Sequence, residues 1–230
     1  MFLPTTIKEV RERGWDQLDV IFFSGDAYID HPAFGAAVVG RLLEAEGYRV
    51  AIVPQPNWRD DLRDFTKLGV PRLFFGVSGG SMDSMVNHYT ANLRLRHDDA
   101  YTPGGKAGFR PDHAVTVYSQ LLKRLYPHVP VVIGGIEASL RRLTHYDYWS
   151  DALKPSILAD SGADLLIYGM GERVVQEVAR AMRNGYNAKL LRKIRQVAFL
   201  SDENYVARLD PATTIRLNSY EECLRSKAAF

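Results

Sequence analysis

Short apolar runs alternate with amphipathic segments along most of the chain. Apolar runs rich in β-branched and aromatic residues, bounded by turn residues, are typical of strands that are buried on both faces of a sheet. Apolar residues repeated at intervals of three and four are typical of helices that cover such a sheet. The apolar runs predict five strands and a shorter sixth, at residues 18–26, 48–55, 72–80, 129–134, 163–168 and 196–200.

The segments between these runs predict the helices. Thr6 and Glu9 have the spacing of a capping box, and Gly14 is placed to end the first helix. Pro32 suits the first position of a second helix, which Gly47 closes. Further helices are predicted at residues 61–68, 81–89, 111–126 and 173–183.

Strands that alternate with helices predict an α/β fold with three layers. We expect a doubly wound, mostly parallel sheet of five to six strands, with the flavodoxin-like order 2-1-3-4-5. Two stretches, VVIGGIEASLRR (131–142) and ADLLIYGMGE (163–172), end a strand in glycines and continue into an acidic residue and a helix. Ligands of open α/β sheets bind at the carboxyl ends of the strands, so these stretches point to the functional edge.

The composition narrows the class of protein. The chain has 230 residues, 46% hydrophobic and 24% charged, and its net charge of +2 gives no general case for nucleic acid or an anionic membrane. No apolar run reaches the length of a membrane helix, and the N-terminus lacks a signal-peptide pattern. Cys223 is the single cysteine, so the chain forms no internal disulfide and no cysteine-only metal site. We therefore expect a cytoplasmic protein.

The loop after the first predicted strand, SGDAYIDHPAFG (24–35), is a candidate site. It leads into a helix N-terminus, which favours an anion, and Asp26, Asp30 and His31 add groups that bind or titrate. A capped helix with solvated acids explains the same residues. The chain has no GxGxxG or GxxxxGK[ST] motif, and its histidines form no HxH or HxxxH pair. A standard NAD site, a P-loop and a structural zinc site are therefore not expected.

A long stretch without regular periodicity, residues 91–110, is a second candidate. Such stretches are unusual in compact domains and often functional. Its interleaved basic and aromatic residues suit a phosphate group or a single nucleic-acid strand, and a surface loop with solvated charges is the alternative. The polar residues concerned include Arg94, Arg96, Asp99, Tyr101, Lys106 and Arg110.

The third candidate is GGIEASLRRLTHYDYWS (134–150). Gly134 and Gly135 let the backbone approach a ligand closely, and Glu137 is suited to accept from a ribose or an amide. His145 and Asp147 have the chemistry of an acid–base pair, although no nucleophile lies near them in the sequence. Packing of the aromatic residues onto the core is the alternative for this segment.

Long motifs of this chain resemble those of the YgiQ-type radical SAM proteins. The motifs are DSMVNHYTANLRLRHDDAYTPGG, RPDHAVTVYSQ, GGIEASLRRLTHYDYWSD and ADLLIYGMGE. The resemblance implies a Rossmann-like domain, similar to cobalamin-binding domains, that precedes a radical SAM barrel in one polypeptide. In that family the barrel carries a CxxxCxxC motif, which holds a 4Fe-4S cluster and binds S-adenosylmethionine. This chain has no such motif, so we expect the catalytic chemistry to lie outside these residues.

Because the resemblance implies a domain similar to cobalamin-binding domains, we compare the chain with the base-off type of these domains. That type carries DxHxxG, SxL and GG motifs. Asp30 and His31 are adjacent here, Ser78 is near the expected distance, and Gly134 and Gly135 match the glycine pair after an insertion. The order and approximate spacing of the motifs are kept, but the DxHxxG pattern that supplies the cobalt ligand is not. The insertion is large enough to fill the ligand crevice. The candidate cofactor-binding residues are His31, Ser78, Gly134, Gly135, Glu137, Gly169, Gly171 and Glu172. The candidate substrate-binding residues are Asp99, Tyr101, Arg141, Arg142, His145 and Asp147.

We therefore expect a Rossmann-like domain at residues 1–200, with an insertion at about 84–110. Residues 201–230 are expected to be a linker or the start of the barrel. The first hypothesis for function is an accessory domain that presents substrate or cobalamin to the radical. The second is a module that binds RNA or a phosphorylated metabolite through the basic insertion, and the third is a hydrolase built on His145 and Asp147.

Overall fold

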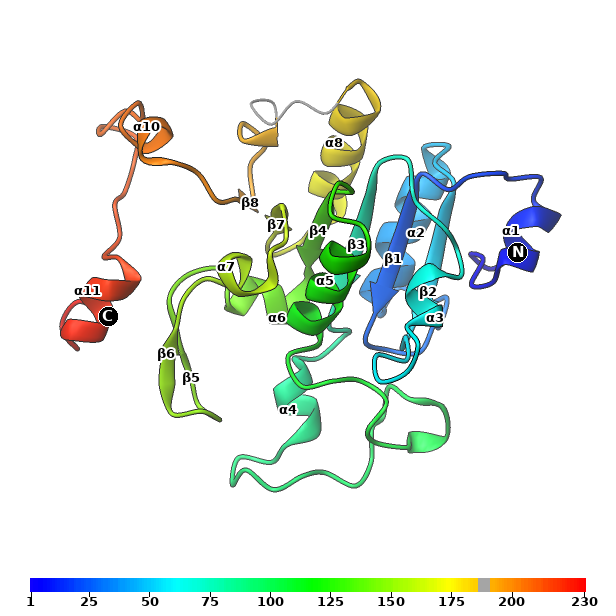
Figure 1. The fold of residues 1–230 in the computed structure, drawn as a ribbon, viewed down its shortest axis with the longest axis horizontal. Helices are drawn as coiled ribbons and strands as arrows, with labels where there is room; N and C mark the ends of the chain where they lie inside the picture. Colours follow the sequence, from blue (N-terminus) through cyan, green and yellow to red (C-terminus); the bar gives the residue numbers. More distant parts are fainter. Residues whose placement is uncertain (186–190) are drawn as a thin grey trace.

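A six-stranded sheet forms the centre of the molecule (Figure 1). The computed structural model describes residues 1–185 and 191–230. The strand order is β2-β1-β3-β4-β7-β8, in which β8 is antiparallel to β7 and the other neighbours are parallel. The parallel strands thus have the predicted order 2-1-3-4-5, and the doubly wound α/β fold is confirmed. The strands are β1 (Val20–Ser24), β2 (Val50–Pro54), β3 (Phe74–Ser78), β4 (Val131–Gly134), β7 (Leu165–Ile167) and β8 (Val197–Ala198).

Helices cover both faces of this sheet (Figure 1). One face packs against α2 (Gly35–Ala45) and α8 (Glu172–Arg183), whose buried residues share a cluster with β1, β2, β3, β4 and β7. The other face packs against α5 (Ala114–Leu125), with the short α3 (Arg63–Thr66) and α7 (Ile157–Ser161) beside it. Apolar burial on two faces is the main force that holds such a three-layer domain together.

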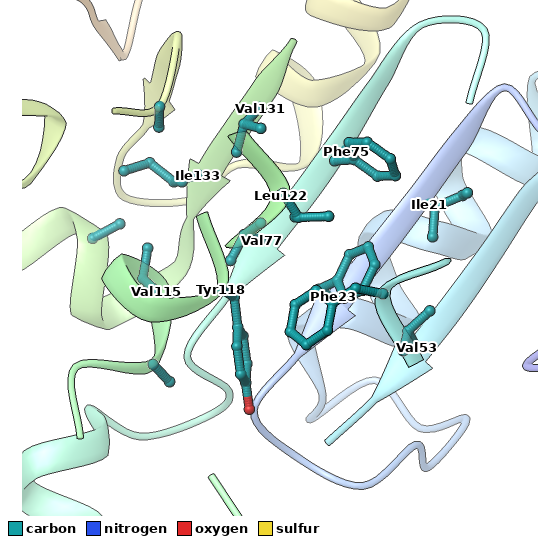
Figure 2. Close-up of a cluster of buried hydrophobic side chains, with 14 of the residues drawn as sticks. Ile21, Phe23, Val53, Phe75, Val77, Val115, Tyr118, Leu122, Val131 and Ile133 are labelled. Atoms are coloured by element: carbon teal, nitrogen blue, oxygen red, sulfur yellow. The ribbon is translucent and has the colours of Figure 1, made fainter. Parts of the chain in front are cut away.

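Strand β1 shows why the sequence folds this way. All five of its residues are buried, and alternate side chains point to opposite faces of the sheet. Phe23 lies on the α5 face (Figure 2). Its ring stacks on that of Phe65 with the centroids 5.2 Å apart. Phe22 lies on the α2 face and meets Phe74 edge-on. A strand with two buried faces must be apolar throughout, which is the pattern seen in the sequence.

The first two helices differ in how well the sequence located them. Helix α1 (Ile7–Glu12) begins at the predicted capping box of Thr6 and Glu9. Helix α2 begins at Gly35, so the prediction that Pro32 occupies its first position is wrong. The reason is a local turn, in which the N–H of Phe34 donates to the carbonyl of His31 at 3.0 Å.

The insertion lies below the carboxyl ends of the strands in Figure 1. It begins with α4 (Ser84–His88) and contains the 3-10 turn η1 (Pro103–Gly105). Two isolated antiparallel bridges, Tyr89 with Leu95 and Asp98 with Lys106, tie its backbone to itself. The segment is therefore irregular, as predicted, but it is folded against the domain.

The segment after β4 contains the helix that the stretch 131–142 predicted and a hairpin that the sequence pattern did not predict. Helix α6 (Gly135–Leu140) follows β4 directly, and a hairpin of β5 (His145–Asp147) and β6 (Ala152–Lys154) follows α6. Strands of three residues are too short to show a period of two, so this hairpin was missed.

Short helices α10 (Glu203–Val206) and α11 (Tyr220–Arg225) follow β8 along the chain. The hydroxyl of Tyr220 donates to the carbonyl of Leu153 at 3.2 Å, which joins α11 to β6. None of the helices in the described ranges is long and apolar enough to cross a membrane.

Candidate functional site

The carboxyl ends of β1, β3, β4 and β7 meet at one edge of the sheet, as parallel strands require. A cavity of about 270 Å³ opens at this edge, on the face that α2 and α8 cover. Its walls are mainly apolar side chains, and its rim is formed by the glycine-rich loops. Among its lining residues are Phe22, Ala36, Val39, Phe74, Val132, Ile167, Met170 and Val175. The predicted cofactor residues that also line it are Ser78, Gly134, Gly135, Gly169, Gly171 and Glu172.

Glycine at position 135 is required by both conformation and space. Its φ of +83° lies in the left-handed region, which a side chain makes costly. A Cβ atom there would lie 2.7 Å from the hydroxyl oxygen of Ser78. Space is also tight at Gly171, where a Cβ atom would lie 3.3 Å from a methyl group of Ile167. Bare backbone therefore forms part of the cavity wall.

His31 and Glu137 do not line this cavity, although the sequence grouped them with the residues that do. His31 is exposed, and its Nδ1 accepts from the N–H of Ala33 at 3.1 Å. Glu137 is 1% exposed, and its carboxylate accepts from the N–H groups of Ser84 at 3.0 Å and Val115 at 2.8 Å. Glu137 thus holds the starts of α4 and α5, and both of its oxygens are occupied.

A buried ion cluster joins the insertion to the sheet edge between β1 and β3. Arg110 is 1% exposed, and its guanidinium lies 3.0 Å from Asp26 Oδ1 and 3.2 Å from Asp99 Oδ2. It also donates to the carbonyl of Gly79 at 2.9 Å. Since β1 and β3 flank the point where the strand order reverses, Arg110 fills the usual ligand crevice of this fold. The insertion therefore closes that crevice, and the α2–α8 cavity stays open beside it.

The predicted substrate residues of the insertion are consequently part of the structure's interior. Asp99 is 1% exposed and is bound by Arg110. The ring of Tyr101 is half-buried, 6.0 Å from the guanidinium carbon of Arg110 and in edge contact with Phe34. Both oxygens of the Asp99 carboxylate accept from Arg110, so they are not free to bind a ligand.

The two arginines after β4 are also engaged within the chain. Arg141 forms a buried ion pair with Asp83, whose carboxylate caps α4 by accepting from the N–H of Met85 at 3.0 Å. Arg142 donates to the carbonyl of Ser139 at 2.7 Å, and its guanidinium carbon lies 5.1 Å from the ring centre of Tyr168. Arg110, Arg141 and Arg142 therefore do not form the exposed basic surface that nucleic-acid binding requires.

His145 and Asp147 lie on the same short strand, but no hydrogen bond joins them in the described ranges. The Nδ1 of His145 is 3.2 Å from the carbonyl of Leu143, and burial lowers the pKa of this imidazole. Asp147 is 4% exposed and accepts from the N–H of Ser150 at 3.1 Å. This arrangement gives no support to an acid–base pair. The described residues also hold no group of three or more His, Cys, Asp or Glu side chains placed to bind a metal ion.

Sequence reasoning missed the apolar walls of the cavity. Phe22, Phe74 and Val132 are ordinary members of buried strands, and Ala36 and Val39 are ordinary helix residues. A signal was present, since these strand positions alternate onto the face covered by α2 and α8. The cavity itself depends on how α2 and α8 pack on the sheet, which no local sequence pattern reports.

The fold and its open edge define a class of protein. It is a doubly wound α/β domain, similar to a domain of the radical S-adenosylmethionine methyltransferase TsrM from Kitasatospora setae. Two structures of that enzyme match with a TM-score of 0.51 and 19% identity over 80% of this chain, one with tryptophan substrate and a SAM analogue, one with cobalamin and a [4Fe-4S] cluster. The chain covers 28% and 29% of those two structures.

The chain belongs to the family described as Radical SAM N-terminal, whose model matches residues 2–230. UPF0313 proteins are similar to it, with 62% identity in Bacteroides thetaiotaomicron and 63% in Porphyromonas gingivalis, each over 98% of this chain. The chain spans 38% and 36% of the length of these two relatives. The resemblance to YgiQ-type radical SAM proteins is thereby confirmed.

Proposed function

We propose that this chain is the accessory domain of a radical SAM enzyme, and that its α2–α8 cavity holds part of a cobalamin. The remainder of the parent protein would carry the 4Fe-4S cluster and S-adenosylmethionine. The observation that carries the proposal is the glycine-rimmed apolar cavity, which lies at the carboxyl edge and is lined by Ser78, Gly134 and Gly135. Support for the cofactor comes from the similar TsrM structure that has cobalamin and a [4Fe-4S] cluster bound.

The residues present fit one mode of cobalamin binding and exclude another. The apolar walls and the bare backbone at Gly135 suit the flat base of the nucleotide tail. No histidine of the described ranges lines the cavity, and His31 is exposed outside it, so the donor set does not fit a cobalt atom ligated by histidine. Ser78 and Glu172 are the side chains suited to polar contacts with the tail. When bound, cobalamin supplies a cobalt centre that carries alkyl groups.

The test is retention of hydroxocobalamin by the full-length protein of which this chain is a part. After incubation and desalting, we expect the visible spectrum of the bound corrinoid. Ala36 lines the cavity on α2, so Ala36→Phe should fill it and abolish retention. Ala45 is exposed on the same helix, so Ala45→Phe is the matched control and should retain the cofactor.

His31→Ala should also retain the cofactor, since this mode does not use His31. A colourless wild-type protein would exclude cobalamin. Equal retention by Ala36→Phe and the wild type would place the cofactor outside this cavity.

A further inference from the structure

A second cavity of about 400 Å³ lies at the same edge but on the face that α5 covers. It is bounded by α4, the insertion, the loop after β2 and the start of α5. None of its lining residues lines the α2–α8 cavity. Its walls include Trp58, Arg59, Asn87, His88, Tyr89, Leu95, Arg96, Asp98, Arg110 and Asp112.

Four residues of these walls each carry a buried side-chain nitrogen that has no hydrogen-bond partner within the described ranges. The atoms are Trp58 Nε1, Asn87 Nδ2, His88 Nε2 and Arg110 Nε. Asn87, His88 and Arg110 are 6%, 8% and 1% exposed, so water from the surface does not readily satisfy them. Trp58 Nε1, Asn87 Nδ2 and Arg110 Nε are donors, and three buried donors without partners around one cavity indicate a missing acceptor-rich group.

His88 is held so that its second nitrogen stays free. Its Nδ1 lies 2.6 Å from Asp112 Oδ1, and the hydroxyl of Tyr89 donates to Asp112 Oδ2 at 2.8 Å. Asp112 therefore fixes the orientation of the imidazole ring, and each of its two carboxylate oxygens has a hydrogen-bond partner.

Three arginines and three aspartates line the cavity, and guanidinium N–H groups remain there for an anion. Arg96 uses its Nε for the carbonyls of Val86 and Tyr89, at 3.3 and 3.2 Å, and Arg59 binds the carbonyl of Gly108 at 3.1 Å. Both guanidinium groups keep further N–H donors. Of the carboxylates, Asp99 is bound by Arg110 and Asp112 by His88 and Tyr89, and Asp98 is exposed.

We propose that this cavity binds the phosphate group of a phosphorylated ligand. Donor nitrogens of Trp58, Asn87 and Arg110 come from the loop after β2, from α4 and from the end of the insertion, and Arg96 adds a charged fork. A phosphate has three terminal oxygens and takes more donors than a carboxylate, so it fits this set better. The apolar side chain of Leu95 and the rings of Trp58 and Tyr89 form an apolar wall, against which the rest of the ligand can pack.

The experiment follows the indole N–H of Trp58 directly. The full-length protein is labelled with ¹⁵N-tryptophan, and the Trp58 signal is assigned with Trp58→Phe. Inorganic phosphate should shift this signal in a saturable way, whereas acetate at equal concentration and ionic strength should shift it little. Trp15 is outside the cavity, so its signal is the internal reference.

Matched variants test the charged fork. Arg96→Met should weaken phosphate binding at least about tenfold, as expected for a hydrogen bond to a charged group. Arg94 is exposed and outside the cavity, so Arg94→Met should change binding less than about twofold. If Arg96→Met alters the circular dichroism spectrum and therefore the fold, phosphate binding by Arg59→Met tests the same point.

Two results would overturn the proposal. One is a Trp58 signal that phosphate leaves unmoved or that moves in step with Trp15. The other is equal binding of acetate and phosphate, which would remove the argument from the number of donors. Neither result bears on cobalamin, because the two cavities lie on opposite faces of the sheet.

Discussion

Arg110 binds groups from separate parts of the chain through one guanidinium. It pairs with Asp26 after β1 and Asp99 in the insertion, and it donates to the carbonyl of Gly79 after β3. A buried cation is tolerated only where such partners surround it, and the cost of removing one member is large. At the scale of single residues, this cluster decides that the insertion covers the sheet edge.

Arg110→Met should therefore lower the free energy of unfolding by about 3–5 kcal/mol, because two buried carboxylates lose their cation. Urea denaturation at neutral pH measures the change. Arg124→Met, at an exposed site on α5, should stay within about 0.5 kcal/mol of the wild type. A loss below about 1 kcal/mol for Arg110→Met would show that the cluster does not hold the insertion.

Helices α4 and α5 depend on a side chain from a third helix, α6. The Glu137 carboxylate accepts one N–H at the start of each, where the backbone donors of a helix have no partner of their own. Asp83 serves α4 in the same way and is held by Arg141. At the scale of elements, the acidic and basic residues after β4 therefore position the helices that border the proposed phosphate cavity.

Glu137→Gln should cost about 2–3 kcal/mol of stability, because one acceptor becomes a donor that faces a buried N–H group. The matched control is Glu172→Gln, in the first turn of α8 and partly exposed, with an expected change below about 1 kcal/mol. Thermal or urea denaturation distinguishes the two variants. Equal effects would contradict the structural role of Glu137.

At the scale of the whole molecule, the two cavities described above lie on opposite faces of one sheet edge, and the insertion borders the cavity on the α5 face. The edge of the sheet thus offers an apolar site and a site rich in nitrogen donors. On the outer surface of α2, Arg41 forms ion pairs with Asp30 and Glu44. Such pairs make the stability of the whole fold depend on pH.

Hydrogen bonds from Arg41 hold the pKa of Asp30 below its ordinary value. The stabilisation is therefore complete above the unfolded pKa of about 3.9 and is lost as the pH falls through the lower folded pKa. We expect the free energy of unfolding to fall below about pH 4, and to fall less steeply in Arg41→Met. Arg173→Met, which removes an exposed pair with Glu177, should keep the wild-type profile. Parallel profiles for all three proteins would refute this assignment.

The sequence by itself determined the layers and the strand order of this domain. Each parallel strand is an apolar run because both of its faces are buried, and burial is recorded residue by residue in the chain. The glycine-ended strands also located the functional edge, since Gly134, Gly135, Gly169 and Gly171 line the α2–α8 cavity. Local periodicity and turn chemistry were sufficient for these features.

Only the tertiary structure decided which polar residues are free to bind a ligand. Asp99, Glu137 and Arg141 have the composition of a binding site, but they are buried against partners distant in the sequence. Asn87 and His88 belong to no binding motif in the sequence, yet both line a cavity and each has a buried side-chain nitrogen without a partner in the described ranges. The physical reason is that a hydrogen bond needs atoms about 3 Å apart. Packing sets such distances, and no pattern of neighbouring residues records them.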